Sequence, residues 1–248
     1  MLHIRPCLAE TPNDTQASYE AAIAENPANA MRTSYGRTRR SVGAHTKYWK
    51  PGRTLKIAIP RYSEALFDAV KAAASEWLPY VNLKFEFVEL DDNDELYEGD
   101  IRVNLTPHSN GTGSSRVGTD ALLALAHHTT MELGTDHTSP RFMYAAIHEF
   151  GHALGLEHEH QHPDANIPWD REKTYKLYCS RFGWSRAEVD VNVLPLARNE
   201  NLTYTPYDRH SIMHYKISSD YTLGDWEQAE NTQLSAGDKA FAQRIYPK

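Results

Sequence analysis

The chain has 248 residues, a formal net charge of −7, 40% hydrophobic residues and 24% charged residues. A protein that binds nucleic acid needs a basic face, so the negative net charge argues against a nucleic-acid partner. No apolar run approaches the roughly twenty residues of a membrane span, which argues against a membrane-spanning segment. We therefore expect a soluble globular protein, most simply a monomer, with enough residues for one large domain or two small ones.

Residues 1–45 are the part of the chain whose role the sequence defines least. They lack the positively charged start and the apolar stretch that together mark a secretory signal. We interpret them as a pro-segment or a leader-like extension, with an ordered part of the following domain as the alternative. The basic cluster GRTRRS, residues 36–41, is a candidate clipping site for a trypsin-like protease.

The first regular elements are predicted after this segment. Apolar and polar residues alternate in TLKIAIP, residues 54–60, which predicts a half-buried strand. Residues 63–78 carry apolar side chains at helical spacing, and Ser63 is a suitable N-cap. Alternation returns in residues 83–88 and 100–105, so both are predicted strands.

Residues 89–100, ELDDNDELYEGD, are strongly acidic and are predicted to form a loop. Their carboxylates could bind Ca²⁺, but their spacing does not fit an EF-hand loop, so we favour a solvated turn. The glycine-rich residues 111–122 are marginally strand-forming. Ser139 and Pro140 then supply an N-cap and a first-turn proline for a longer helix.

The stretch HEFGHALGLEHEH within and beyond this helix has the spacing of a metal site. His148 and His152 are four residues apart, so a helix places both on one face, with Glu149 at the rim. Gly155 can adopt the left-handed conformation that ends a helix, which allows His158 to turn back as a third ligand. Catalytic zinc takes three protein ligands and keeps one open position, and this pattern provides them.

Three further segments follow in the C-terminal part. Residues 169–194 suggest one or two helical turns and a loop rich in Tyr and Trp. In YDRHSIMHY, residues 207–215, Met213 could fill irregular space without needing a hydrogen bond. Ser235 and Asp238 have capping-box spacing and predict a terminal helix.

The extended motif H-E-x-x-H-x-x-G-x-x-H followed by a methionine turn resembles the metzincin zinc proteases. Glu159 directly after the third histidine and Tyr215 two residues after Met213 are similar to the astacin family within that group. Leu156 stands where astacins usually have phenylalanine, and only two cysteines are present, so the usual disulfides are missing. The sequence therefore looks like a microbial, cysteine-poor branch of the astacin-like proteases.

This resemblance implies an α+β zincin fold: a twisted, mixed, mainly five-stranded sheet with an active-site helix and a backing helix, and a smaller irregular C-terminal subdomain that ends in a helix. The catalytic domain would span residues 46–248, with an upper subdomain of residues 46–158 and a lower one of residues 159–248. Residues 111–122 would form the edge strand above the cleft, next to residues 129–135, and a peptide substrate would bind there as an added strand.

The resemblance also implies the chemistry, which is that of a metalloendopeptidase with one catalytic Zn²⁺. Its implied zinc ligands are His148, His152 and His158, with Glu149 as general base. Tyr215 would be a fifth ligand or a stabiliser of the transition state, while Gly155, Glu159 and Met213 would have structural roles. A zinc amidase or deacetylase and a catalytically silent zinc-binding module remain alternatives. We expect a secreted or exported protein, although no signal peptide is visible.

Cys7 is a candidate latency ligand, because many metzincins are silenced by a pro-segment residue at the open zinc position and a thiolate binds zinc well. The alternatives are a free thiol or a disulfide with Cys179. If clipping occurs, Glu159 would pair with the new α-amino group, as in astacins. His214 is interpreted as structural. The other histidines are expected to be mostly solvated or second-shell; these are His127, His128, His137, His160, His162 and His210.

Overall fold

The computed structural model describes residues 7–10, 12–30, 45–90, 99–199 and 202–248. The helices are α1 (Thr15–Glu25), α2 (Glu64–Ser75), α3 (Pro140–Ala153), α4 (Arg171–Phe182), α5 (Arg186–Asn192) and α6 (Ala236–Ile245). The strands are β1 (Leu8–Glu10), β2 (Thr54–Pro60), β3 (Lys84–Leu90), β4 (Ile101–Leu105), β5 (Gly113–Arg116) and β6 (Met131–Leu133). Short 3₁₀ turns are η1 (Pro27–Asn29), η2 (Leu78–Tyr80), η3 (Pro107–Ser109), η4 (Gly118–Leu123), η5 (Glu159–Gln161) and η6 (Ser219–Tyr221). The predicted α+β class is confirmed.

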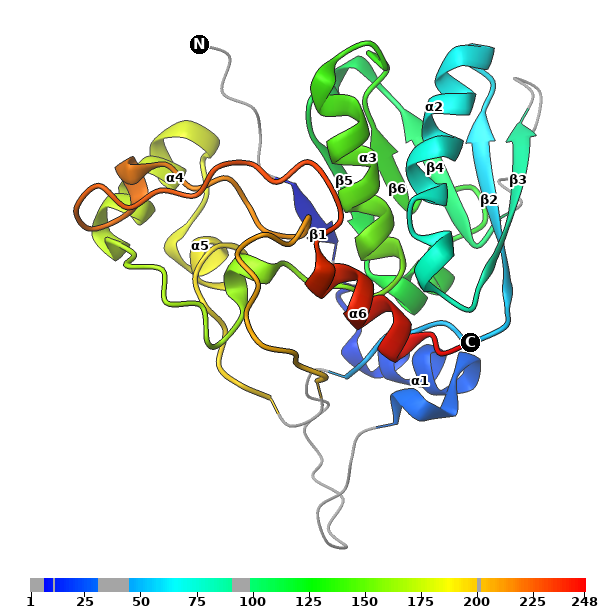
Figure 1. The fold of residues 1–248 in the computed structure, drawn as a ribbon, viewed down its shortest axis with the longest axis horizontal. Coiled ribbons are helices and arrows are strands. Elements are labelled where there is room, and N and C mark those ends of the chain that lie inside the picture. The colour runs from blue at the N-terminus through cyan, green and yellow to red at the C-terminus, as the bar shows by residue number, and fades with distance from the viewer. Residues whose placement is uncertain (1–6, 11, 31–44, 91–98, 200–201) are drawn as a thin grey trace, which may run out of the picture.

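The strands form one mixed sheet in the order β1-β5-β6-β4-β2-β3. β5 runs antiparallel to β6, whereas the other neighbours are parallel. Helices α2 and α3 lie side by side on one face of the sheet (Figure 1). Five strands match the expected sheet, and the sixth, β1, was not anticipated because it comes from the N-terminal segment. Its pairing with β5 covers the edge that was predicted to be free.

Helix α2 backs the helix that carries the metal motif. Ser63 caps its start by accepting from the Leu66 N–H, as predicted. Just beyond its end, the buried Trp77 indole donates to the Ile147 carbonyl of α3 at 3.0 Å. This bond satisfies a buried donor and ties the two helices together near the metal motif.

The C-terminal end of α3 is held by two side chains from distant parts of the chain. The last carbonyls of a helix lack partners within the helix and must find them elsewhere when buried. Here the Trp49 indole donates to the Ala153 carbonyl, and the Tyr246 hydroxyl donates to the Leu154 carbonyl, both at 2.8 Å. The point where the chain leaves the helix is therefore fixed.

The second half contains more helix than predicted. Residues 169–194 form α4 and α5 rather than one or two turns. Only Thr174 and Tyr178 are buried in α4, so the helix has no apolar stripe that periodicity could detect. None of the helices in the described part of the chain combines the length and apolar character needed to cross a bilayer.

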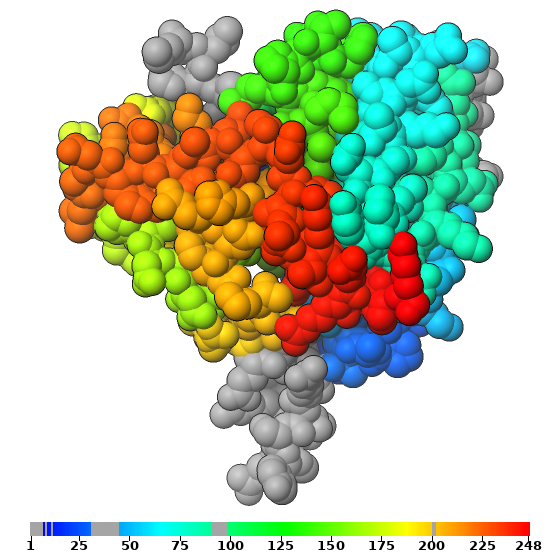
Figure 2. All heavy atoms as spheres, in the orientation of Figure 1, coloured from blue at the N-terminus to red at the C-terminus, as the bar shows by residue number. Residues whose placement is uncertain are grey.

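Helix α6 begins at the predicted capping box of Ser235 and Asp238. Asp238 has a second role, because its carboxylate also accepts from the Ser211 hydroxyl at 2.6 Å and from the Ile212 N–H at 2.8 Å. Figure 2 shows this segment, in red, on the face where the two halves of the molecule meet. The terminal helix thus holds the residues that precede Met213.

The N-terminal segment packs onto the domain through buried polar contacts. Ser18 of α1 donates to the Asp120 carboxylate at 2.5 Å, and Lys47 pairs with the same carboxylate at 2.6 Å. The Asn29 side chain donates to the Tyr48 carbonyl at 2.8 Å and accepts from the Tyr48 N–H at 3.0 Å. Residues 12–30 are thus packed against the rest of the described chain.

Candidate metal centre

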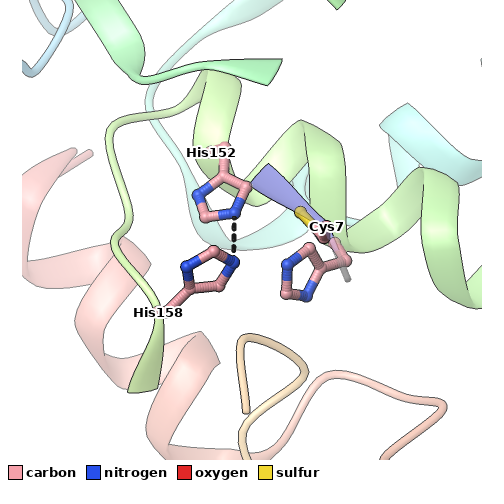
Figure 3. A group of neighbouring side chains, drawn as sticks. Cys7, His152 and His158 are labelled. Carbon is pink, nitrogen blue, oxygen red and sulfur yellow. Dashed lines mark hydrogen bonds between the residues drawn. The ribbon is translucent and has the colours of Figure 1, made fainter. Parts of the chain in front are cut away.

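Three histidines and one cysteine converge where α3, the chain after it and β1 meet. The ligand atoms of Cys7, His148, His152 and His158 all lie within 4.8 Å of one another. Figure 3 shows a ring nitrogen of His152 and one of His158 pointing at each other, with Cys7 beside them; these Nε2 atoms are 3.0 Å apart. Two facing lone pairs would repel at this distance, so a proton or a cation must lie between them.

The hydrogen bonds of the Nδ1 atoms of His148 and His152 determine which ring atoms face the metal centre. His148 Nδ1 lies 2.8 Å from the Ile212 carbonyl, and His152 Nδ1 lies 2.8 Å from the Leu156 carbonyl. A carbonyl can only accept, so both Nδ1 atoms carry the proton and both Nε2 atoms present a lone pair. His148 Nε2 is buried and has no hydrogen-bond partner among the described residues. A metal ion would supply that partner.

Burial also keeps the rings in the form that binds metal. It lowers the pKa of His148 to about 4 and that of His152 to about 3. The pKa of His158 is likewise lowered by burial and by the neighbouring histidines. All three imidazoles are therefore neutral near pH 7. Together with a thiol they form an N₃S donor set, which suits tetrahedral zinc.

Gly155 lies where α3 gives way to the third histidine. Its φ of +91° is the left-handed conformation expected there, and a Cβ atom at this position would approach the Tyr48 ring within 2.9 Å. The Gly155 N–H donates to the His152 carbonyl at 2.8 Å, which closes the last turn. The chain then reverses and carries His158 back to the centre.

Glu149 follows the first histidine and is 1% exposed. Burial raises the pKa of its carboxyl to about 8, and its Oε2 has no hydrogen-bond partner among the described residues. Gly113 of β5 lies directly against it, since a Cβ atom there would stand 2.6 Å from Glu149 Cγ. The sequence did not identify this role of Gly113, because no local pattern relates a strand glycine to a residue 36 positions away.

Met213 is 1% exposed. Its sulfur packs against Gly151, the residue before His152 in α3. The turn that carries it is held by the Met213 N–H, which donates to Ser211 Oγ at 3.0 Å, and by the contacts of Asp238 described above. Sequence reasoning recognised Asp238 only as a helix cap.

Tyr215 is buried beside the metal centre. Its ring centroid lies 4.4 Å from that of His158, and its hydroxyl donates to the Cys7 carbonyl. Burial raises the pKa of the phenol well above its ordinary value, so it is protonated and can donate. His214 points elsewhere: its Nδ1 bonds the Tyr215 carbonyl and its Nε2 bonds the Tyr207 hydroxyl, both at 2.8 Å.

Cys7 reaches the centre because β1 runs along β5, with Leu8 opposite Ser114. Burial and the nearby Glu149 carboxylate raise the pKa of its thiol, so ionisation of the thiol requires a cation such as zinc. In the described part of the chain both cysteines are free, and Cys179 is exposed. The alternative of a bridge between Cys7 and Cys179 is therefore wrong.

Glu159 turns away from the metal centre. Its carboxylate accepts from the Asp208 N–H at 2.7 Å, and burial raises its pKa to about 7. It lines a cavity of about 460 Å³ between the N-terminal segment, the chain near Lys47 and the second half of the molecule. The expected pairing of Glu159 with a new α-amino group stays a prediction.

The structure describes the other histidines singled out in the sequence, but not the basic cluster or most of the acidic loop. His160 and His162 are buried, whereas His127, His128 and His210 are exposed and His137 is half-buried. The basic cluster at residues 36–41 and most of the acidic loop, residues 91–98, lie outside the described residues.

Most of this chain is similar to solved structures of other proteins. One structure of myroilysin is 38% identical with a TM-score of 0.73, covering 82% of this chain and 96% of that chain. A second myroilysin structure is 36% identical with a TM-score of 0.60, covering 82% and 86%. High choriolytic enzyme 1, a hatching enzyme zinc-protease from the medaka fish Oryzias latipes, shares the fold at 18% identity and a TM-score of 0.54, covering 81% and 94%. No family model and no curated protein matches.

The fold and the histidine centre define a metzincin, a class of zinc metalloendopeptidases. The chain belongs to the astacin-like family of that class, together with myroilysin. The family and the enzyme class predicted from the sequence are thereby confirmed, as is the use of one zinc ion.

Proposed function

We propose that this chain is the latent form of its protease, with zinc held by His148, His152 and His158 and with Glu149 as the general base. The observation that carries the assignment is the convergence of three neutral imidazoles on one point, next to the buried Glu149 carboxyl, whose Oε2 has no hydrogen-bond partner among the described residues. Zinc bound here polarises a water molecule and the scissile carbonyl and lowers the pKa of that water towards neutrality.

Glu149 carries the proton in this proposal. Its carboxylate accepts a proton from the attacking water and returns it to the leaving amine. A neighbouring divalent cation favours the ionised carboxylate and so opposes the burial that raises the Glu149 pKa to about 8. Near pH 7 a filled metal site therefore increases the fraction of Glu149 that is ionised and able to act as the base.

Tyr215 stabilises the negative charge that develops on the substrate carbonyl oxygen. The bond from its hydroxyl to the Cys7 carbonyl supports this role, because it is a contact with a main-chain carbonyl beside the metal centre. The hydroxyl stays protonated, since burial raises its pKa. The alternative role of Tyr215 is direct ligation of zinc by its phenolic oxygen.

Peptide substrates occupy the place that β1 holds in the latent form. The pairing of β1 with β5 supports this, because it uses the backbone groups that an added strand would use. Cys7 blocks the centre at the same time by offering a thiolate as the fourth zinc ligand. Residues 12–30, anchored through Ser18 and Asn29, keep the inhibitory strand in place.

Cleavage between the segment and the domain, followed by loss of β1, activates the enzyme. Residues 1–45 are then the pro-segment and residues 46–248 the catalytic domain. The cavity beside Glu159 supports the further step in which a new α-amino group enters and pairs with that carboxylate. Sequencing the N-terminus of the active form would test the step, and an intact Met1 would contradict it.

A latent protease also fits export, because a silent enzyme spares the proteins of the cell that makes it. We propose that the chain is secreted. Detection of the chain in the medium of intact source cells would support this, and its confinement to the cells would refute it.

The main experiment digests a proteome-derived peptide library with the zinc-loaded chain, before and after limited trypsin treatment, and reads the products by mass spectrometry. Glu149→Gln is the control, because it keeps the shape of the side chain but cannot accept the proton. Internal cuts that appear after trypsin treatment and vanish in the variant support the proposal. Release of acetate from acetyl-lysine peptides without internal cuts would favour a deacetylase, and neither product would favour a silent zinc module.

Latency is tested with Cys7→Ser, matched by Cys179→Ser at the exposed cysteine. The first variant should cut peptides without trypsin treatment, and its zinc X-ray absorption spectrum should lose the sulfur ligand. The second should stay latent with the sulfur ligand present. A Cys7→Ser protein that stays silent and keeps its zinc spectrum would refute the role of Cys7.

A further inference from the structure

The flat face of the Tyr215 ring is covered by a histidine that is not a zinc ligand in the proposed mechanism. The centroids of Tyr215 and His160 are 4.0 Å apart, and their planes are inclined by only 19°. His160 lies in η5, two residues after His158, and is 0% exposed. The histidine is thus fully buried against the side chain that we assign to the transition state.

The nitrogen atoms of His160 contribute little to its position. Its Nδ1 has no hydrogen-bond partner among the described residues. Its Nε2 lies 3.4 Å from the Asn192 carbonyl, longer than a good hydrogen bond. Among its ring contacts the Tyr215 phenol is the nearest and the one stacked face to face, since the centroids of His158 and His214 lie 5.2 and 6.2 Å away.

The backbone of Tyr215 is fixed separately. The His214 ring bonds the Tyr215 carbonyl at 2.8 Å, and Tyr207 in turn bonds the other nitrogen of His214 at 2.8 Å. With the backbone held, the position of the hydroxyl depends on the two side-chain torsions of Tyr215. The ring of His160 packs against the face of the phenol and so limits both torsions.

We propose that His160 is a positioning residue for the reaction: its ring is the platform that holds the Tyr215 hydroxyl where a substrate carbonyl lies. The inference rests on the role of Tyr215 given under Proposed function. A hydrogen-bond donor stabilises a developing oxyanion only when its oxygen is already in place, because reorientation during the reaction would cost part of the gain. In the latent form the same platform holds the hydroxyl on the Cys7 carbonyl.

The test compares His160→Leu, which fills the volume without a flat face, with His160→Phe, which keeps the flat face without the nitrogens. Both are made in the full chain and in a Tyr215→Phe background, then zinc-loaded and trypsin-treated. A stacked aromatic pair contributes up to about a factor of ten, so His160→Leu should lower kcat about tenfold with KM nearly unchanged. His160→Phe should retain most of the activity, and in the Tyr215→Phe background His160→Leu should cause no further loss.

Binding of a phosphinic peptide by calorimetry gives a readout that needs no turnover, because the phosphinate mimics the oxyanion. His160→Leu should weaken that binding about tenfold, whereas His160→Phe should not. Zinc content and thermal unfolding of every variant are measured alongside. If the leucine variant does not fold, His160→Asn replaces it with the same expectation.

Equal losses from His160→Leu in the two backgrounds would show a general structural role and overturn the proposal. A phenylalanine variant as weak as the leucine variant would overturn it as well, because the flat face would then not be the feature that matters. Full activity of Tyr215→Phe alone would instead refute the role of Tyr215 assigned under Proposed function, which keeps the two failures distinct.

Discussion

The sulfur of Met213 packs so closely against Gly151 that a Cβ atom added to this glycine would overlap it. Gly151 lies inside the zinc helix, between Glu149 and His152, where glycine would ordinarily weaken a helix by about 1 kcal/mol relative to alanine. The absence of a side chain here lets the methionine turn approach the helix that carries the ligands. The surface of the helix at Gly151 and the surface of the turn at Met213 are therefore complementary in shape.

Gly151→Ala should lower the free energy of unfolding by about 1–3 kcal/mol, the usual cost of overpacking a core. Urea unfolding of the zinc-loaded protein measures it. Combining it with Met213→Ala provides the control: the sulfur is then gone and only the Trp77 ring, 3.1 Å from the added Cβ atom, still crowds the alanine, so its cost should be much smaller. The same destabilisation with and without Met213 would show that the clash is not with the methionine.

Gly113→Ala should reduce activity while leaving zinc bound. A Cβ atom on Gly113 would stand 2.6 Å from Cγ and 2.8 Å from Oε1 of Glu149 and 2.9 Å from the Glu132 carbonyl oxygen of β6, so both the carboxylate and the strand backbone must shift relative to each other. Displacement of a general base by about 1 Å can cost on the order of a hundredfold in rate. The trypsin-treated enzyme is assayed for kcat and zinc content, with Ser114→Ala on the opposite face of β5 as the control. Unchanged kcat would contradict the contact.

Acid should destabilise the metal-free protein. The pKa of His148 is about 4 and that of His152 about 3 in the fold, against 6.5 when unfolded, so the unfolded chain binds more protons between these values. Above pH 6.5 both states are neutral and the two residues have no effect. Below it, each should lower the free energy of unfolding by about 1.4 kcal/mol per pH unit until its folded pKa is reached. Urea unfolding after chelation, from pH 7.5 to 4.5, measures the loss.

Glu149 should act in the opposite direction. Its folded pKa of about 8 lies above the ordinary 4.5, so it contributes stability that is fully present below pH 4.5 and is lost as the pH rises to 8. Glu149→Gln removes this contribution, and the loss of stability on acidification should become steeper. An unchanged pH dependence in the metal-free variant would show that the carboxyl is not protonated in the fold.

Ser18→Ala should loosen the N-terminal segment. The Ser18 hydroxyl is buried and donates to the Asp120 carboxylate, and loss of one buried partner costs about 1–3 kcal/mol. Hydrogen exchange in residues 15–25 should accelerate, and trypsin should activate the variant sooner. Gln16→Ala, at an exposed position of the same helix, should change neither. Equal exchange in both variants would mean that Ser18 does not anchor α1.

The sequence by itself determined the features that depend on local spacing. A helix places residues four apart on one face, so His148 and His152 were recognised without any tertiary information. The helix caps at Ser63, Ser139 and Ser235 were equally local, because each side chain bonds a backbone N–H within three residues. The family followed from adding Met213 and Tyr215 at the end of this pattern.

Tertiary structure alone decided which distant residues support those elements. Asp238 accepts a hydrogen bond from the turn before Met213. Gly113 leaves room for the Glu149 side chain, and the His160 ring stacks on Tyr215. No periodicity in the sequence predicts any of these contacts. The three-residue strand β1 was equally invisible, because its backbone finds hydrogen-bond partners only when β5 is already in place. Local geometry sets the spacing of the proposed metal ligands, whereas packing between remote segments decides how rigidly they are held and what covers them.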